Sequence, residues 1–133
     1  HTADPGTDPL ALGADFSVTS DRKALTGRSN LIFGHVAGRD AEWAERIHTW
    51  CTQHGSIAGP MKVWLAHRSL TTLSVRLERQ CFNAQAIAEY LAARTEVLSV
   101  RYPGSPTDPT HAIAEQQIKL FGSVVSFVLP DQS

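Results

Sequence analysis

The feature of the sequence that most restricts its fold is a long run of apolar residues at helical spacing between Leu70 and Ala93. Apolar side chains three and four positions apart share one face of an α-helix, so this run predicts the longest helix of the chain. The stripe consists of Leu70, Leu73, Leu77, Cys81, Ala84, Ile87, Ala88 and Leu91. The charged residues of this segment mostly avoid the stripe, which is typical of a helix packed on one side.

Short β-prone runs alternate with further helical segments along the rest of the chain. The runs are Phe16 to Ser20, Leu31 to Ala37, Val97 to Arg101 and Val124 to Leu129. The further helices are predicted from Asp40, as N-cap, to about His54 before Gly55, from Gly59-Pro60 through Trp64 and Leu65, and from His111 to Leu120 before Gly122. The order strand, strand, helices, strand, helix, strand predicts an α/β or α+β protein.

Composition excludes several classes of function. A chain of 133 residues is long enough for one domain or parts of two, and 42% hydrophobic with 19% charged residues is ordinary for a soluble globular protein. A net charge of -1 gives no indication of nucleic acid or an acidic membrane as partner. We find no apolar run long enough to cross a bilayer and no signal peptide.

Cysteine and histidine usage points to a cytoplasmic protein without a metal site. Cys51 and Cys81 are far apart and do not form a disulfide framework, so we expect reduced thiols. The six histidines do not combine with them at a familiar ligand spacing, which predicts no metal site. We expect His35 and His48 to be structural residues.

A basic group in a turn carries the candidate chemistry. Arg22, Lys23 and Arg28 follow a predicted strand in a polar, glycine-containing segment. Strand ends are where α/β folds place ligand sites, and a lysine there can act as a nucleophilic amine if neighbouring cations or burial lower its pKa. From local composition alone, a solvated basic loop is the simpler interpretation.

The segment DFSVTSDRKALTGRSN resembles the lysine motif of the cysteine/methionine-metabolism family of pyridoxal-phosphate enzymes, which includes cystathionine γ-lyase, cystathionine γ-synthase, cystathionine β-lyase and methionine γ-lyase. The matching residues are Asp15, Phe16, Ser20, Lys23, Leu25, Gly27 and Ser29. Three positions depart from the family pattern: Arg22 replaces threonine, Ala24 an aromatic residue, and Arg28 histidine.

The resemblance continues in register through most of the chain from about Asp8. The stretch GSIAGPMKVWLAHRSLTTLSVRLERQCFNA is similar to the family's run from its Gly-Pro helix to Asn-Ala. Further matches are the signature from Tyr102 to His111, Phe121-Gly122, and Val125 to Phe127. Agreement of several motifs in the same order is much more specific than one motif alone.

The resemblance implies a fold, an α/β pyridoxal-phosphate transferase fold of the aspartate-aminotransferase type. Residues 1–73 would be the C-terminal part of the large cofactor-binding domain, and residues 74–133 the first part of the small α+β C-terminal domain. The family's aspartate for the pyridine nitrogen would fall just before His1, and its arginine for the substrate carboxylate would fall beyond Leu129. We therefore expect a complementing segment of the same enzyme, or a homo-oligomer, to complete the site.

The resemblance also implies residue roles. Lys23 would hold pyridoxal 5'-phosphate as a Schiff base and shuttle protons on a small-molecule amino-acid substrate. Ser20 would donate to the cofactor phosphate, and Arg22 could do so as a charge-assisted donor. The implied function is a carbon–sulfur lyase or transsulfuration enzyme acting on cystathionine or a related sulfur amino acid. The alternative is a non-catalytic truncated relative, either an interaction or oligomerisation module or a decayed remnant.

Overall fold

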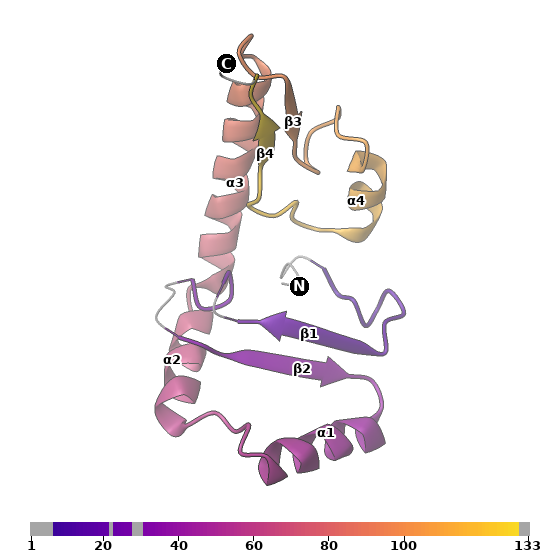
Figure 1. Cartoon of the computed structure of the whole chain (residues 1–133), viewed down its shortest axis with the longest axis vertical. Helices are drawn as coiled ribbons and strands as arrows, with labels where there is room; N and C mark the ends of the chain where they lie inside the picture. The colour runs from indigo at the N-terminus through magenta and orange to yellow at the C-terminus, as the bar shows by residue number, and fades with distance from the viewer. Residues whose placement is uncertain (1–6, 22, 28–30, 131–133) are drawn as a thin grey trace. The chain divides into compact units, whose positions relative to one another are not determined.

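The computed structural model describes residues 7–21, 23–27 and 31–130, and it contains both helices and strands (Figure 1). The chain divides into two compact units, His1–Ser74 and Val75–Ser133. Each unit has one antiparallel pair of strands among its described residues. The prediction of a mixed α and β architecture is confirmed, and the two units are described separately below.

The sheet of the first unit pairs β1 (Phe16–Ser20) with β2 (Gly34–Gly38). The register places Phe16 opposite Gly38 and Ser20 opposite Gly34. Figure 1 shows the two strands side by side and running in opposite directions. β1 has the predicted bounds, but β2 begins three residues later than the predicted run from Leu31 to Ala37. The chain turns after Ser20, so the first residues of that run have no strand opposite them. Leu31, which lies before the start of β2, is buried, with 4% of its surface exposed.

Two helices follow the sheet, as predicted. α1 (Ala41–Gln53) begins after Asp40, whose side chain accepts hydrogen bonds from the backbone nitrogens of Glu42 (2.8 Å) and Trp43 (3.2 Å). α1 ends before Gly55, which has φ +70°, a conformation that favours glycine. The ring of Trp43 meets the ring of Phe16 edge to face at 6.5 Å and so packs α1 against β1. α2 (Pro60–Leu70) starts at the predicted proline.

The second unit is built on α3 (Leu73–Ala92), the longest helix. Its bounds are narrower than the predicted segment, because Leu70 ends α2 and Thr71 caps it. Leu77, Ala84 and Ala88 are the buried members of the predicted stripe, whereas Ile87 is 52% exposed. The predicted apolar stripe is therefore buried at Leu77, Ala84 and Ala88. The small side chains of the two alanines let other residues pack close to the helix.

The core of the second unit forms where α3 meets a two-stranded sheet. β3 (Ser99–Arg101) pairs antiparallel with β4 (Ser126–Val128). Tyr102, 1% exposed, joins Ala84 and Ala88 in the core. The half-buried side chains packed against this core are Val100, Phe121 and Val125. Both strands are shorter than predicted, because the ladder pairs only three residues of each strand.

The last helix, α4 (His111–Gln117), ends earlier than the predicted Leu120. The backbone nitrogen of Ile118 still donates to the carbonyl oxygen of Ala114 at 2.8 Å, but Ile118 itself is extended, with φ −123° and ψ 128°. The chain has to leave the helix here because Phe121 is packed against the core of the unit. The prediction that Gly122 ends the helix was therefore wrong.

Three general features bear on function. Within the described part of the chain, no helix has the length and apolar character needed to span a membrane. In the same residues, no three side chains of histidine, cysteine, aspartate or glutamate lie together as metal ligands would. Cys51 and Cys81 are both free thiols.

Candidate functional site

A tight turn follows β1 and carries Lys23. The backbone nitrogen of Asp21 donates to the carbonyl oxygen of Phe33 at 3.0 Å. The nitrogen of Thr26 donates back to the oxygen of Asp21 at 3.0 Å, and that of Gly27 to the oxygen of Lys23 at 2.8 Å. Gly27 has φ +66°, which glycine adopts without strain. These bonds hold the turn directly at the end of the strand.

The predicted site residues Ser20 and Lys23 lie at this strand end. Ser20 is the last residue of β1 and is half-buried, whereas the side chain of Lys23 is exposed. None of the residues that the structure describes forms an ion pair or a hydrogen bond with the Lys23 amine. Arg22, the third predicted residue, lies outside the described residues. Lys23 is thus an accessible amine close in sequence to a strand-end hydroxyl.

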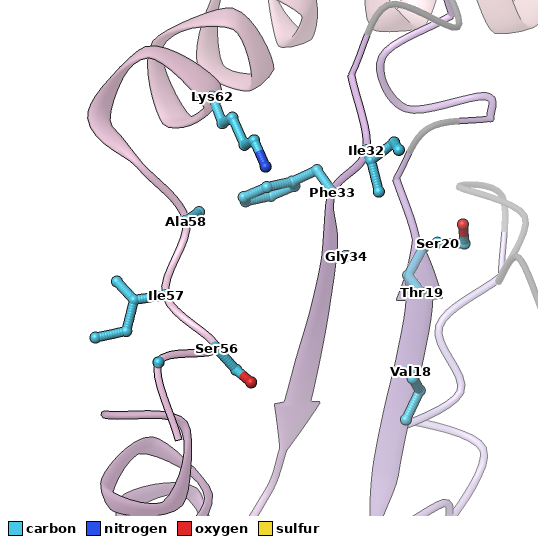
Figure 2. Close-up of a pocket in the computed structure, with 11 residues that line it drawn as sticks. Val18, Thr19, Ser20, Ile32, Phe33, Gly34, Ser56, Ile57, Ala58 and Lys62 are labelled. Carbon is cyan, nitrogen blue, oxygen red and sulfur yellow. The ribbon is translucent and has the colours of Figure 1, made fainter. Parts of the chain in front are cut away.

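A cavity of about 520 Å³ lies beside the same strands (Figure 2). Ser20 belongs to its lining, and Lys62, in the first turn of α2, is its described basic residue. Figure 2 shows the side chain of Lys62 extending toward the ring of Phe33. The full lining is Val18, Thr19, Ser20, Ile32, Phe33, Gly34, Gly55, Ser56, Ile57, Ala58 and Lys62. Lys23 is not among these residues.

Sequence reasoning did not single out Lys62. Its only sequence signal is its place just after Pro60, at the start of a predicted helix, and that position carries no chemical information. What makes it notable is that the loop before α2 returns to the strands, so that Ser56 and Ile57 line the same cavity as Ser20. The position of Lys62 beside the strands depends on the tertiary fold, so the sequence alone does not predict it.

A buried carboxylate lies next to the turn. The side chain of Asp21 is fully buried, and the Nδ1 atom of His35 lies 2.9 Å from its Oδ2 atom and 3.0 Å from its Oδ1 atom. The His35 side chain is 45% exposed. The expectation that His35 is a structural residue agrees with this contact. Asp21 was not predicted as a site residue, because the pairing requires the β1–β2 register.

Among the described residues of the second unit, the carboxylate of Asp108 has a shifted pKa. Asp108 accepts hydrogen bonds from the hydroxyl (2.6 Å) and the backbone nitrogen (2.8 Å) of Thr110, and from Nε of Arg101 (3.1 Å). The two Thr110 bonds, and then Arg101, lower the pKa of Asp108 from 3.8 to about 2 against the opposing effect of burial. All of these partners precede or begin α4, so the cluster fixes the start of that helix. The cluster organises local structure and contains no nucleophile.

The family model described as Cys/Met metabolism PLP-dependent enzyme matches residues 4–133. The chain belongs to this family. Members of the Cys/Met metabolism family depend on pyridoxal phosphate (PLP) as cofactor. The resemblance proposed from the sequence motifs is therefore confirmed over nearly the whole chain.

Individual relatives agree with the family assignment. The chain is 49% identical over 128 residues to a protein of Streptomyces coelicolor (strain ATCC BAA-471 / A3(2) / M145) named putative cystathionine gamma-lyase, covering 96% of this chain and 33% of that protein. It is 39% identical over 125 residues to the cystathionine beta-lyase of Lactococcus lactis subsp. cremoris (strain MG1363), covering 94% of this chain and 33% of that protein. The chain thus spans about a third of the length of these relatives.

A solved structure supports the fold. The cystathionine gamma-lyase of Lactobacillus plantarum, complexed with L-serine, is similar to this chain with a TM-score of 0.93 and 34% identity. The match covers 98% of this chain and 35% of that one. The mixed α/β fold of this Cys/Met metabolism family member is therefore shared with an enzyme of known structure.

The residues at the end of β1 have the chemistry that PLP requires. The cofactor carries an aldehyde, which a lysine amine can attack, and a phosphate, which needs hydrogen-bond donors. The exposed Lys23 amine has no described ion-pair partner that would have to be displaced. Ser20 offers a hydroxyl donor at the strand end. This donor set fits the cofactor of the family.

Proposed function

We propose that this chain is the lysine-bearing part of a PLP-dependent carbon–sulfur lyase or transsulfuration enzyme acting on cystathionine or a related sulfur amino acid. The observation that carries the proposal is the position of Lys23, an accessible amine on a tight turn at the end of β1 within a chain of this family. The names of the relatives, which are cystathionine lyases and synthases, support the substrate class.

Each of the three proposed site residues has its own role. PLP, when bound, supplies an electron sink for reactions at the substrate's α-carbon. The Nζ atom of Lys23 would hold the cofactor and, when free, would move protons between the α-carbon and the neighbouring carbons of the substrate. The Ser20 hydroxyl would donate to the cofactor phosphate. Arg22, which stands where the family pattern has threonine, is proposed as a charge-assisted phosphate donor.

The wider assignments are proposed on the same basis. Residues 1–73 correspond to the end of the large cofactor-binding domain of an aspartate-aminotransferase-like fold, and residues 74–133 to the start of the small domain. The division of the structure after Ser74 is compatible with this assignment. A homo-oligomer or a complementing segment of the same enzyme supplies the remaining site residues. Two free thiols, at Cys51 and Cys81, support a reducing compartment such as the cytoplasm.

Cofactor capture by this chain can be tested directly, because the sequence contains only three lysines, Lys23, Lys62 and Lys119. The purified chain is mixed with PLP, and the visible absorbance band of lysine-bound cofactor is recorded. The complex is then reduced with borohydride and digested, and the labelled lysine is located by mass spectrometry. All three lysines are exposed. We expect the label on Lys23, since it stands at the lysine of the family motif and is carried by the turn after β1.

Two variants make this test specific. Lys23→Ala is expected to abolish the band, whereas Lys62→Ala, which removes the lysine of the cavity, is expected to leave it intact. A label distributed equally over the three lysines, or a band that survives in Lys23→Ala, would contradict the proposal. Turnover is tested separately as thiol release from cystathionine by the polypeptide that contains this chain.

The second candidate is a non-catalytic relative that acts as an interaction or oligomerisation module, or a decayed remnant. It is favoured by the departures from the family's lysine motif at Arg22, Ala24 and Arg28, which cluster around Lys23. This candidate predicts no Lys23-dependent band even when the polypeptide is complete. The absorbance measurement, repeated on the polypeptide that contains this chain, therefore discriminates between the two candidates.

A further inference from the structure

We propose that Asp21 and His35 form a clamp that positions the turn carrying Lys23 for covalent capture of the cofactor. Neither residue matches the family's lysine motif, and neither has been assigned a role in the site. Both are positioning residues, because they act on the backbone that carries Lys23. The inference rests on the proposed function of Lys23.

The first step is the contact between the two side chains. Asp21 has no exposed surface, so its carboxylate has lost its contact with water and needs hydrogen-bond donors from the protein. The Nδ1 atom of His35 lies within 3.0 Å of both carboxylate oxygens. An ionised carboxylate can only accept, so Nδ1 carries the hydrogen and donates to it. Asp21 is therefore held from the neighbouring strand.

The second step connects this contact to the turn. Besides its side-chain contact, Asp21 uses both of its backbone polar groups. Its nitrogen donates to Phe33, and its oxygen accepts from the nitrogen (3.0 Å) and the hydroxyl (2.8 Å) of Thr26. Thr26 is itself 1% exposed. Asp21 thus closes the turn at both ends, and Lys23 is an exposed side chain carried between Asp21 and Thr26.

The third step is the consequence for Lys23. Its amine has no described partner of its own, so the direction in which it points depends on the backbone of the turn. If the His35 donor is removed, the buried carboxylate loses this hydrogen bond and is expected to move toward water. Such a movement would open the bonds to Thr26. Binding of the cofactor would then have to order the turn, and the entropy lost in doing so would weaken its affinity.

The test uses two substitutions of His35 and one control. His35→Leu removes the donor, whereas His35→Asn supplies an amide nitrogen in place of Nδ1. His48→Leu is the matched control, because His48 is an exposed histidine in the same unit, 4.0 Å from Glu45. His35 is almost half exposed, so neither of its variants creates a deep cavity.

The first measurement needs no cofactor. Hydrogen exchange is followed at the backbone amides of Thr26 and Gly27, with the amide of Ala88 in α3 as an internal control for folding. Loss of one hydrogen bond changes an equilibrium by on the order of tenfold. We expect protection of the turn amides to fall about tenfold in His35→Leu, to return in His35→Asn, and to be unchanged in His48→Leu. Unchanged protection in His35→Leu, with Ala88 still protected, would overturn the clamp.

The second measurement is the apparent dissociation constant for PLP from the Lys23-dependent absorbance band. We expect it to rise about tenfold in His35→Leu and to be restored in His35→Asn. A lower turn protection with unchanged PLP affinity would overturn the positioning role, because the turn would then matter only for structure. If the unaltered chain shows no Lys23-dependent band, capture of the cofactor by this chain alone fails, and amide exchange decides whether the clamp exists.

Discussion

The hydroxyl of Tyr102 donates to the carbonyl oxygen of Gly122 at 3.1 Å from inside the core of the second unit. It also lies 3.5 Å from the carbonyl oxygen of Cys81. One side chain at the end of β3 is thereby connected to α3 and to the segment leading into β4. This bond links elements that are distant in sequence within the unit.

Tyr102→Phe removes that hydroxyl and with it the hydrogen bond to the carbonyl oxygen of Gly122. We expect the free energy of unfolding to fall by about 1 kcal/mol, the net value of a typical hydrogen bond, with a larger loss if no water replaces it. The measurement is urea unfolding followed by circular dichroism. Tyr90→Phe is the control, because Tyr90 is 59% exposed on α3, and no loss is expected there. Equal effects of the two substitutions would contradict the role of the Tyr102 hydroxyl.

Gly104→Ala tests how closely the core is packed around the same tyrosine. A Cβ atom at this position would lie 2.5 Å from Cε1 of Tyr102, 2.7 Å from Oε1 of Gln85 and 3.0 Å from Cδ2 of Phe121. Overpacking of this kind costs about 1–3 kcal/mol, so a clear loss of thermal and urea stability is expected.

Gly59→Ala is the matched control for that substitution, since a Cβ atom at Gly59 would meet nothing within 4 Å. A smaller loss of stability is expected there, because Gly59 is the N-cap of α2 and alanine is less favourable than glycine at that position. If Gly104→Ala is as stable as the unaltered chain, the close approach of Gly104 to Tyr102 is not maintained in solution.

Asp108 makes the second unit sensitive to acid. Its pKa is lowered from 3.8 to about 2 by the bonds from Thr110 and by Arg101. A group whose pKa is lower in the folded state stabilises the fold above its unfolded pKa and loses this contribution as pH falls through its folded pKa. We therefore expect stability to decline between about pH 4 and pH 2. Asp108→Asn is expected to be less stable at neutral pH and to lose less stability over this interval.

The measurement is urea unfolding at a series of pH values in that interval. Glu115→Gln serves as control, because Glu115 is 69% exposed on the neighbouring α4, and the acid dependence should remain. An Asp108→Asn variant with the same pH profile as the unaltered chain would show that another group controls the acid sensitivity.

Local sequence signals predicted those elements that depend on local interactions. Asp40 and Gly55 mark the ends of α1 because an N-cap acceptor and a left-handed glycine act within one turn of the helix. Phe16–Ser20 was predicted with its bounds, but β2 was placed too early, because its start depends on where β1 ends. α4 was predicted too long, since the packing of Phe121 that ends it is a tertiary contact.

The candidate site was predictable only in part, for the same reason. Ser20 and Lys23 were named because they match a linear motif, and the structure places them at a strand end and its turn. His35 and Asp21 are fourteen positions apart and meet only through the register of the sheet. Lys62 lines the cavity from the start of α2, because the loop before that helix lies beside the strands. These contacts depend on the tertiary fold, so no local sequence pattern predicts them.

The pairing of Ser20 with Gly34 limits how this region can change in length and composition. A Cβ atom at Gly34 would lie 2.9 Å from the carbonyl oxygen of Thr19, so a larger residue cannot enter without moving β1. Deleting one residue within β2 would turn the side chains on one side of the deletion to the opposite face of the sheet, because side chains alternate along a strand. In relatives of this chain, insertions and deletions are therefore expected to be absent from residues 34–38. Changes in the length of this unit should occur in other segments.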